Sequence, residues 1–153
     1  MSATAKEYFT ANAIASDMFA LMCGEYLGGG CGREVYVSLL DPNFVIKIET
    51  GTGRFQNAME WRFWEENRGA PDFAKWLAPC ISISPCGNIL VQKRTAPLRR
   101  LEMKKYGRLP KFLTDVKMSN FGILGGKLVC HDYGYVSTVL DSGMRKVDWG
   151  VNT

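Results

Sequence analysis

The stretch LGGGCGREVY, residues 27–36, followed by FVIKIE, residues 44–49, decides the fold. The first segment is β-type sequence interrupted by glycines, and the second is a short apolar run with Lys47 inside it. Asp41-Pro42-Asn43 stands between them, and these residue types are typical of a turn. The pattern predicts two strands joined by a glycine loop and a third strand after a tight turn, which together form an antiparallel meander.

Helical patterns lie on both sides of this meander. From Thr4 to Cys23 the apolar residues recur at three- and four-residue spacings, which indicates an amphipathic helix ended by Gly24. Residues 55–68 show a second helical pattern, and Gly69-Ala70-Pro71 ends it. We therefore expect one helix before the meander and one after it.

Two more strands are predicted at residues 80–84 and 88–93, joined by Pro85-Cys86-Gly87. The expected fold is α+β, with about five antiparallel strands, one helix packed across the sheet and an N-terminal helix.

The second half of the chain has a sparser pattern. Residues 97–106 indicate a basic helix, and residues 107–110 indicate a break. A loop is expected over residues 115–122. Short strands are predicted at Phe121–Leu124 and Lys127–Cys130, with a turn at Gly125-Gly126 between them.

Length and composition indicate one globular domain. The chain has 153 residues, of which 46% are hydrophobic and 22% charged, so extensive disorder is not expected. The sequence has neither an apolar run long enough to span a membrane nor the pattern of a secretory signal, which predicts a cytoplasmic protein. Its five cysteines are scattered and it has one histidine, so we expect free thiols, packed as small hydrophobic side chains, rather than a zinc site.

Positive charge is concentrated between Lys93 and Lys117. This stretch holds nine basic and two acidic residues, a net charge of +7 in a chain whose net charge is +4. Such a block can attract phosphates, nucleic acid or an acidic protein surface, and it can equally be a solvated surface that aids solubility.

Five motifs with chemical potential follow one another along the chain. Each is weak alone, because a glycine-rich hairpin, a strand lysine, a helix glutamate or an Asp/Asn turn usually has a structural role. They are a glycine-rich segment, a lysine in a strand, a glutamate on a helix, a D-x-K-x-x-N segment and a D-aromatic-G segment. Their key residues are Gly28, Gly30, Gly32, Arg33, Val35, Lys47, Glu60, Asp115, Lys117, Asn120 and Asp132.

In this order the motifs resemble those of the protein-kinase-like family. Residues 27–36 resemble the loop that covers the ATP phosphates, and residues 45–47 (VIK) resemble the strand that bears the ATP-anchoring lysine. Residues 115–120 match the spacing of the catalytic loop. Residues 127–134 resemble the strand that ends in the metal-binding D-F-G, with Tyr133 in place of phenylalanine.

The resemblance covers residues 27–134 of the sequence. It implies one kinase-like domain over residues 1–153, with residues 1–95 similar to an N-lobe and residues 96–153 similar to a much reduced C-lobe.

The resemblance also implies a role for each motif residue in holding ATP and Mg²⁺. Lys47 would contact the α- and β-phosphates and pair with Glu60, although Glu65 and Glu66 are nearby. Asp115 would orient an acceptor hydroxyl and take its proton, with Lys117 near the γ-phosphate. Asn120 and Asp132 would hold Mg²⁺. The remaining nucleotide contacts would come from Gly28, Gly30, Gly32, Arg33 and Val35.

The sequence departs from the family pattern in three places. Gly32 comes one position early, and Arg33 stands at the expected third glycine, where it could cap phosphate or mark a degenerate site. Leu113-Thr114 precedes Asp115, so the His-Arg of H-R-D is absent. The segment before Asp115 is short, and nothing like a substrate-binding helical lobe follows Gly134. These changes weaken the case for protein phosphorylation more than the case for nucleotide binding.

Three functions are compatible with the sequence. The first is a minimal Mg-ATP-dependent phosphotransferase acting on Ser/Thr-type hydroxyls or on itself. The second is a catalytically weak or inactive kinase-like protein that binds and modulates a partner with an acidic surface; compact chains of this sort resemble products of bacterial viruses, which implies a bacterial host protein and its cytoplasm. The third is nucleic-acid binding through residues 93–117. We expect His131 to be a packed or surface residue rather than a base.

Overall fold

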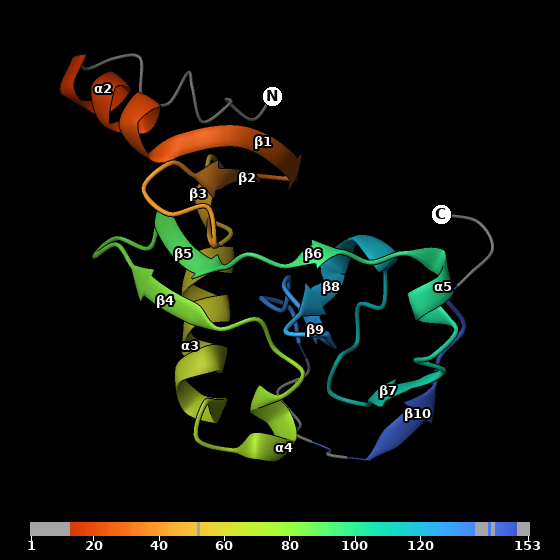
Figure 1. The fold of residues 1–153 in the computed structure, drawn as a ribbon. Coiled ribbons are helices and arrows are strands. Elements are labelled where there is room, and N and C mark those ends of the chain that lie inside the picture. The colour runs from red at the N-terminus through yellow and green to blue at the C-terminus, as the bar shows by residue number, and fades with distance from the viewer. Residues whose placement is uncertain (1–12, 52, 137–140, 142, 150–153) are drawn as a thin grey trace. The chain divides into compact units, whose positions relative to one another are not determined.

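A five-stranded sheet organises the first part of the chain. The computed structural model describes residues 13–51, 53–136, 141 and 143–149. The strands follow the order β1-β2-β3-β5-β4, and all neighbours are antiparallel (Figure 1). The predicted α+β class and five-stranded antiparallel sheet are therefore confirmed. The strands are β1 (Cys23–Gly30), β2 (Arg33–Ser38), β3 (Phe44–Glu49), β4 (Cys80–Ile83) and β5 (Ile89–Lys93).

The chain divides into two units, which we describe separately. The first consists of Met1–Trp61 and Cys80–Arg94, and the second of Arg62–Pro79 and Thr95–Thr153. The division after Arg94 lies beside the boundary expected at residues 95–96. Residues 62–79 group with the second unit, although in sequence they lie between strands of the five-stranded sheet.

The glycine-rich segment forms a hairpin with a two-residue connection. Gly30 pairs with Arg33, which leaves Cys31 and Gly32 as the turn. Gly32 has φ +102°, a region that favours glycine, so the turn requires glycine there. The prediction of a glycine loop is therefore wrong in detail, because residues 28–30 belong to β1 and Arg33 begins β2.

The turn predicted at residues 41–43 is confirmed. The carboxylate of Asp41 accepts the backbone N–H of Asn43 at 2.9 Å, and the backbone N–H of Phe44 bonds to the Asp41 carbonyl at 3.1 Å. An aspartate at the start of such a turn stabilises it by this side-chain contact. The turn sets the β2–β3 register, in which Val35 stands opposite Lys47.

One face of the sheet carries the apolar core of the first unit. Ile46 and Ile48 form a buried cluster with Cys23, and Phe19 and Met22 of α2 (Ala13–Met22) pack against it. Successive strand residues face opposite sides, which is why alternate β3 positions meet this helix. The N-terminal helix predicted over residues 4–23 is thus present from residue 13, and residues 4–12 of that prediction lie outside the described residues.

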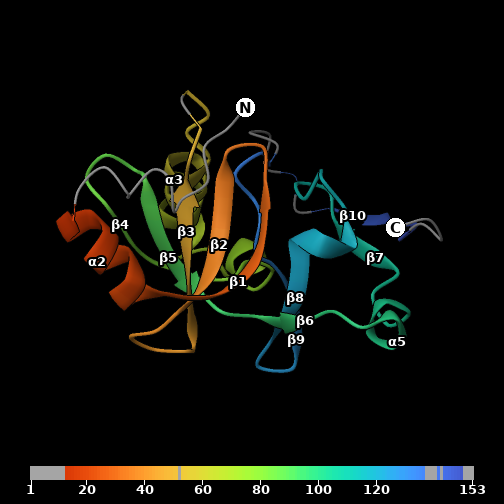
Figure 2. The same ribbon diagram turned by 90° about the horizontal axis from the view of Figure 1, so that it is seen from above.

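The helix α3 (Gln56–Asn67) carries polar residues to the other face of the sheet. Its first half belongs to the first unit, and α3 lies beside the five-stranded sheet (Figures 1 and 2). There Glu60 meets Lys47 of β3 and Gln92 of β5. The prediction of one helix packed across the sheet, at residues 55–68, is therefore confirmed with ends one residue shorter.

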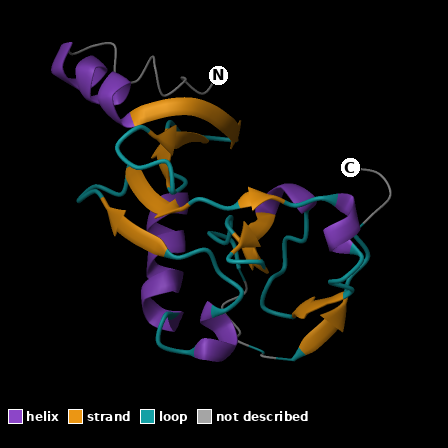
Figure 3. Cartoon of the chain, in the orientation of Figure 1, coloured by secondary structure: helices purple, strands orange, loops and turns teal. Residues whose placement is uncertain are grey.

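The second unit contains two small sheets. In the first, β8 (Phe121–Leu124) and β9 (Lys127–Cys130) form a hairpin with the predicted bounds, and β6 (Ala96–Pro97) pairs with β8. In the second, β7 (Arg108–Pro110) pairs with β10 (Met144–Lys146), and the two strands lie side by side in Figure 3.

Two predictions for this unit need correction. Residues 107–110 are not a break, because β7 occupies most of them and pairs with a partner far along the chain. The basic helix expected over residues 97–106 is limited to α5 (Arg100–Met103), since Pro97 belongs to β6. A short helix that the sequence analysis did not predict, α4 (Pro71–Ala74), follows α3.

Aromatic side chains form the core of the second unit. Phe63 from the second half of α3 lies 5.9 Å from Phe112 and 6.0 Å from Tyr133, measured between ring centroids. Phe73 of α4 lies 5.2 Å from Phe112. The Tyr133 hydroxyl donates to the Ala78 carbonyl at 2.7 Å, so the polar atom of this buried side chain is hydrogen-bonded. A phenylalanine at position 133 could not make this bond.

The five cysteines are free thiols, as predicted. Cys23, Cys80 and Cys130 are buried, and burial raises the pKa of Cys23 to about 11. Cys31 and Cys86 are exposed, so the expectation of a packed small hydrophobic side chain is wrong for these two. Among the described residues, no helix combines the length and apolar character needed to span a bilayer.

Candidate functional site

A buried ion network lies between the sheet and α3 in the first unit. The Lys47 Nζ atom is 2.5 Å from Glu60 Oε1, and the Arg33 Nη1 atom is 2.9 Å from Glu60 Oε2. Glu60 is 0% exposed, Lys47 2% and Arg33 4%. The sequence-predicted partner of Lys47 is therefore Glu60, rather than Glu65 or Glu66, and one carboxylate holds two cations.

Amide side chains complete the network. Gln92 Nε2 donates to Glu60 Oε1 at 2.7 Å, and Arg33 Nη1 donates to Asn57 Oδ1 at 3.3 Å. Asn57 and Glu60 are three residues apart on α3, a spacing that places both on one helix face. Sequence reasoning missed Asn57 and Gln92. The one available signal was the alternation in β5. Gln92 stands two residues after the buried Leu90 and therefore faces the same side of the sheet, which indicates that Gln92 is buried as well.

A second carboxylate balances the charge near this network. Glu49 Oε1 accepts the backbone N–H of Asn57 at 2.7 Å, at the start of α3, where the helix dipole favours negative charge. Glu49 also stands opposite Arg33 in the β2–β3 register. The buried cations Arg33 and Lys47 are thus matched in number by Glu49 and Glu60.

Glu60 is held in its ionised form. Burial alone would raise the pKa of Glu60, but the charges of Arg33 and Lys47 and their hydrogen bonds outweigh this, and the pKa lies below its ordinary value. The Lys47 ammonium therefore faces a carboxylate that stays charged above its ordinary pKa, and this contact fixes the position of Lys47 in the first unit.

The structure corrects the expected position of Arg33. The sequence placed Arg33 in a loop over the phosphates, where it could cap them. Because Gly32 closes the hairpin, Arg33 is already the first residue of β2, and its guanidinium is directed to Glu60 and Asn57. In the described geometry Arg33 therefore ties the glycine hairpin to α3.

The three consecutive glycines in β1 differ in what they require. Gly28 has φ +151°, and a Cβ on Gly29 would come within 3.0 Å of the Arg33 carbonyl oxygen, so neither position readily accepts a side chain. A Cβ on Gly30 would meet no atom within 4 Å, and Gly30 has no positive φ. The fold therefore does not itself demand glycine at position 30. Val35, half-buried in β2, stands opposite Lys47.

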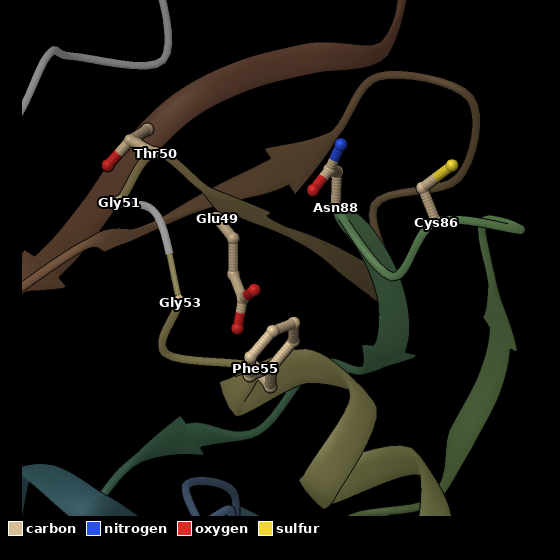
Figure 4. Close-up of a pocket in the computed structure, with 7 residues that line it drawn as sticks. All are labelled: Glu49, Thr50, Gly51, Gly53, Phe55, Cys86 and Asn88. Carbon is tan, nitrogen blue, oxygen red and sulfur yellow. The ribbon is translucent and has the colours of Figure 1, made fainter.

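A shallow pocket of the first unit lies at the start of α3. It has a volume of about 170 Å³, and Figure 4 shows the Glu49 side chain pointing toward Phe55 across it. Phe55 is 64% exposed and has φ +53°, which is uncommon for a residue other than glycine. None of the sequence-predicted site residues lines this pocket. Its lining consists of Glu49, Thr50, Gly51, Gly53, Phe55, Cys86 and Asn88.

In the second unit the D-x-K-x-x-N segment closes on itself. Asn120 Nδ2 donates to both the Asp115 carbonyl and its Oδ2 atom at 3.0 Å, and Lys117 Nζ lies 3.2 Å from Asp115 Oδ1. Asp115 and Lys117 are exposed, whereas Asn120 is buried at the end of the 3₁₀ turn Met118–Asn120. The structure thus brings three of the predicted site residues together. The amide nitrogen of Asn120 makes both of these bonds, so Asn120 Oδ1 takes no part in them.

Asp132 lies beside the end of this segment. The backbone N–H of His131 bonds to the Asn120 carbonyl at 2.8 Å, which continues the β8–β9 pairing up to the residue before Asp132. The Asp132 side chain is exposed. Oxygen ligands of this kind suit Mg²⁺, which needs few protein ligands. Among the described residues, no group of three or more His, Cys, Asp or Glu side chains forms a ready-made metal cluster.

His131 has a structural role, in agreement with the sequence expectation. Its Nε2 atom lies 2.8 Å from the Ser119 carbonyl oxygen, and its Nδ1 atom lies 2.8 Å from Thr95 Oγ1. A carbonyl only accepts, so Nε2 carries a proton and donates it to the Ser119 carbonyl. The ring thereby braces the 3₁₀ turn that ends in Asn120.

No protein-family model matches the chain, and no curated protein sequence matches it. Its function is therefore inferred from the side chains that each unit brings together.

Proposed function

We propose that the protein is a minimal Mg-ATP-dependent phosphotransferase with a kinase-like architecture. The observation that carries this proposal is the buried pair of Lys47, in a central strand, and Glu60, on the packed helix. Burying such a pair contributes little to stability, because apolar residues of similar size are often at least as stable. In protein kinases the lysine that contacts the ATP phosphates stands on a strand and pairs with a glutamate of the packed helix, which is the arrangement of Lys47 and Glu60.

The glycine hairpin of the first unit supports the same proposal. Gly30 has space around it and no conformational need for glycine, which is expected where a backbone must approach a bulky anion. In this proposal Lys47 binds the α- and β-phosphates, and Val35, opposite Lys47 in the register, contributes apolar contact to the nucleotide.

The second unit would supply the residues for transfer. Asn120 and Asp132 would hold Mg²⁺, which when bound neutralises phosphate charge. Asp115 would accept the proton of an acceptor hydroxyl. The acceptor oxygen then forms a bond to the γ-phosphorus, the bond from that phosphorus to the β,γ-bridging oxygen breaks, and ADP leaves with the bond electrons. Lys117, which pairs with Asp115, would lie near the transferred group.

Nucleotide binding can be tested by substituting Gly30. ATP with Mg²⁺ should raise the melting temperature of the native chain. Gly30→Ala should leave the melting temperature without ligand nearly unchanged and weaken ATP binding about tenfold, equivalent to ~1.4 kcal/mol. Gly69→Ala is the matched control, since Gly69 is also unhindered but follows α3. Equal ATP affinity in both variants, or no ATP-induced shift at millimolar concentrations, would contradict the proposal.

Catalysis can be tested with labelled ATP and purified protein. We expect slow phosphoryl transfer to the chain itself or to water, lost in Asp115→Ala and Asp132→Ala. Asp72→Ala, which removes an exposed carboxylate of α4, should keep it. Because general-base and metal-ligand losses cost on the order of several kcal/mol in the transition state, both site variants should fall below detection. If the protein binds ATP but transfers no phosphate at high protein concentration, the phosphotransferase function is contradicted and only the nucleotide-binding part of the proposal stands.

A second candidate function is partner binding through an exposed basic surface. The like charges of Arg108 and Lys146 stand directly opposite in the β7–β10 ladder, an arrangement that costs stability. Within the described part of the chain, no ion pair neutralises the cations of this surface. We define the basic surface as Arg100, Lys104, Lys105, Arg108 and Lys146, all exposed.

The occupant of the basic surface would be an acidic protein segment. Tyr106 and Phe112 are the aromatic residues within residues 93–117, and Phe112 is buried, so few rings are available to stack on bases. Fluorescence anisotropy with a labelled poly-glutamate peptide should show binding that survives Asp115→Ala and Asp132→Ala. Stronger, steeply salt-dependent binding of a single-stranded oligonucleotide of equal charge would instead favour the nucleic-acid function.

A further inference from the structure

The segment of residues 113–120 depends on contacts from other parts of the second unit. The Thr114 hydroxyl donates to the Tyr135 carbonyl at 3.3 Å, and His131 bonds to the Ser119 carbonyl at 2.8 Å. At its other end, Arg145 Nη2 donates to the Leu113 carbonyl at 2.6 Å, a shorter distance than either. Leu113 precedes Asp115 by two residues, so this bond fixes the backbone that leads into Asp115.

Arg145 reaches Leu113 from the inner side of the β7–β10 ladder. It stands opposite Leu109, which is fully buried, and side chains directly opposite in an antiparallel pair lie on the same face. The flanking Met144 and Lys146 are exposed, as the strand alternation requires. The guanidinium is therefore directed into the unit, toward the approach to Asp115.

The environment of Arg145 is poorly suited to a residue kept for stability. Its Nε atom is buried and has no hydrogen-bond partner among the described residues. Such a buried unsatisfied donor costs about 1–3 kcal/mol, which an apolar side chain would avoid. A methionine could fill the space, but only a long cationic side chain can donate a charge-assisted bond to the Leu113 carbonyl.

The strand that carries Arg145 is held along its length. The backbone N–H of Lys111 bonds to the Gly143 carbonyl at 2.9 Å, and Lys111 Nζ lies 3.1 Å from Asp141 Oδ2. Farther along, the Trp149 indole N–H donates to the Tyr106 carbonyl at 2.8 Å. Because the residues on both sides of β10 are hydrogen-bonded to the segment around β7, the backbone of Arg145 is fixed in position relative to Leu113.

We propose that Arg145 is a positioning residue for the D-x-K-x-x-N segment. Arg145 binds the Leu113 carbonyl and thereby fixes the backbone that leads from the buried Leu113 to the exposed Asp115. The side chains of Leu113 and Thr114 carry no positive charge that could do the same. The expected effect of Arg145 on turnover rests on the proposed phosphotransferase function. Its expected effect on the backbone of residues 113–120 does not depend on that function.

The test compares Arg145→Met with Arg68→Met in the full chain. Arg68 is the control, because it belongs to the same unit but is exposed and pairs with Glu65 at 3.5 Å, away from residues 113–120 in sequence. In Arg145→Met we expect kcat to fall about 10- to 100-fold, the range of one charged hydrogen bond, while KM for ATP changes less than about twofold. Amide hydrogen exchange in residues 113–120 should accelerate by a similar factor. Arg68→Met should change neither the kcat nor the exchange rate.

The two readouts separate the two proposals. If the wild-type chain transfers no phosphate but exchange accelerates only in Arg145→Met, the phosphotransferase function fails and the positioning role stands. If turnover is present and both variants match the wild type in kcat and exchange, the positioning role is overturned. Should Arg145→Met not fold, Arg145→Gln serves instead, since glutamine is polar but shorter and uncharged, and so cannot make the charge-assisted bond. An Arg145→Gln variant identical to Arg68→Met in both readouts would equally overturn the inference.

Discussion

The buried network of the first unit and the D-x-K-x-x-N segment of the second unit hold polar residues by different means. Glu60 is fully enclosed and receives donors from β2, β3 and β5, each separated from it by 13 to 32 residues in sequence. Asp115 is exposed and is held by residues two and five positions away. The first arrangement is specified by burial and the second by local backbone geometry, so the same substitution should have very different costs in the two places.

The largest effect is expected at Glu60. Glu60→Ala leaves Lys47 and Arg33 buried without their shared counter-charge, which should lower the free energy of unfolding by about 3–5 kcal/mol. Urea denaturation measures this. Glu66→Ala on the same helix is the control, because Glu66 forms an exposed pair with Arg62 and should cost less than about 0.5 kcal/mol. Similar losses of unfolding free energy in Glu60→Ala and Glu66→Ala would show that the buried ion network contributes no more to stability than an exposed ion pair.

Acid should lower the free energy of unfolding of the wild type more than that of Glu60→Gln, which has no charge at this position. The folded state holds the pKa of Glu60 below its ordinary value of 4.5, so the unfolded chain binds more protons there. The stability contributed by Glu60 is therefore present above pH 4.5 and is lost as the pH falls through the lower folded-state pKa. Urea denaturation of the wild type and Glu60→Gln between pH 7 and pH 3 should give curves that converge toward acid. Parallel curves would contradict the assignment.

A smaller effect is expected at Asn120. Its amide bridges the carbonyl and carboxylate of Asp115 and is buried, so Asn120→Ala should lower the free energy of unfolding by about 1–2 kcal/mol. Ser119→Ala is the neighbouring control, since Ser119 is exposed and contributes its backbone carbonyl to His131. A loss at position 120 as large as that at Glu60 would remove the contrast between the two regions.

The smallest effect on stability is expected at Lys117. Its pair with Asp115 is exposed to solvent, so Lys117→Ala should change the free energy of unfolding by less than about 1 kcal/mol. The same variant should lose phosphoryl transfer if Lys117 acts near the γ-phosphate. A variant with full activity would show that the lysine serves the local loop alone.

Local patterns predicted the parts of the fold that local forces determine. The strand FVIKIE, the turn at Asp41 and the hairpin at Gly125-Gly126 follow from alternation and turn chemistry, and the structure contains all three. The pairing of Lys47 with Glu60 was expected from the resemblance to the protein-kinase-like family, which left Glu65 and Glu66 as nearby alternatives. The structure selects Glu60, which is buried beside Lys47.

Long-range pairing accounts for most of what could not be predicted. Strands β7 and β10 have three residues each and are separated by more than thirty positions, so neither shows an alternation that identifies it. Arg145 could not be connected to Leu113 for the same reason. Arg33 was misplaced because its role depends on where the hairpin turns, and a run of glycines does not reveal which of them forms the turn.

The sequence separations within the Glu60 network also bear on how the chain folds. Closing Glu60 onto Arg33 and Gln92 requires β2, α3 and β5 to be in place together, and contacts of this kind form slowly because the intervening loops must first be ordered. The hydrogen bonds between Asp115 and Asn120 themselves lie within six adjacent residues, whereas the contacts from Tyr135 and Arg145 to the same segment come from farther along the chain. During refolding, the local turn can therefore form early, while the ammonium of Lys47 acquires its counter-charge only when the sheet is nearly complete.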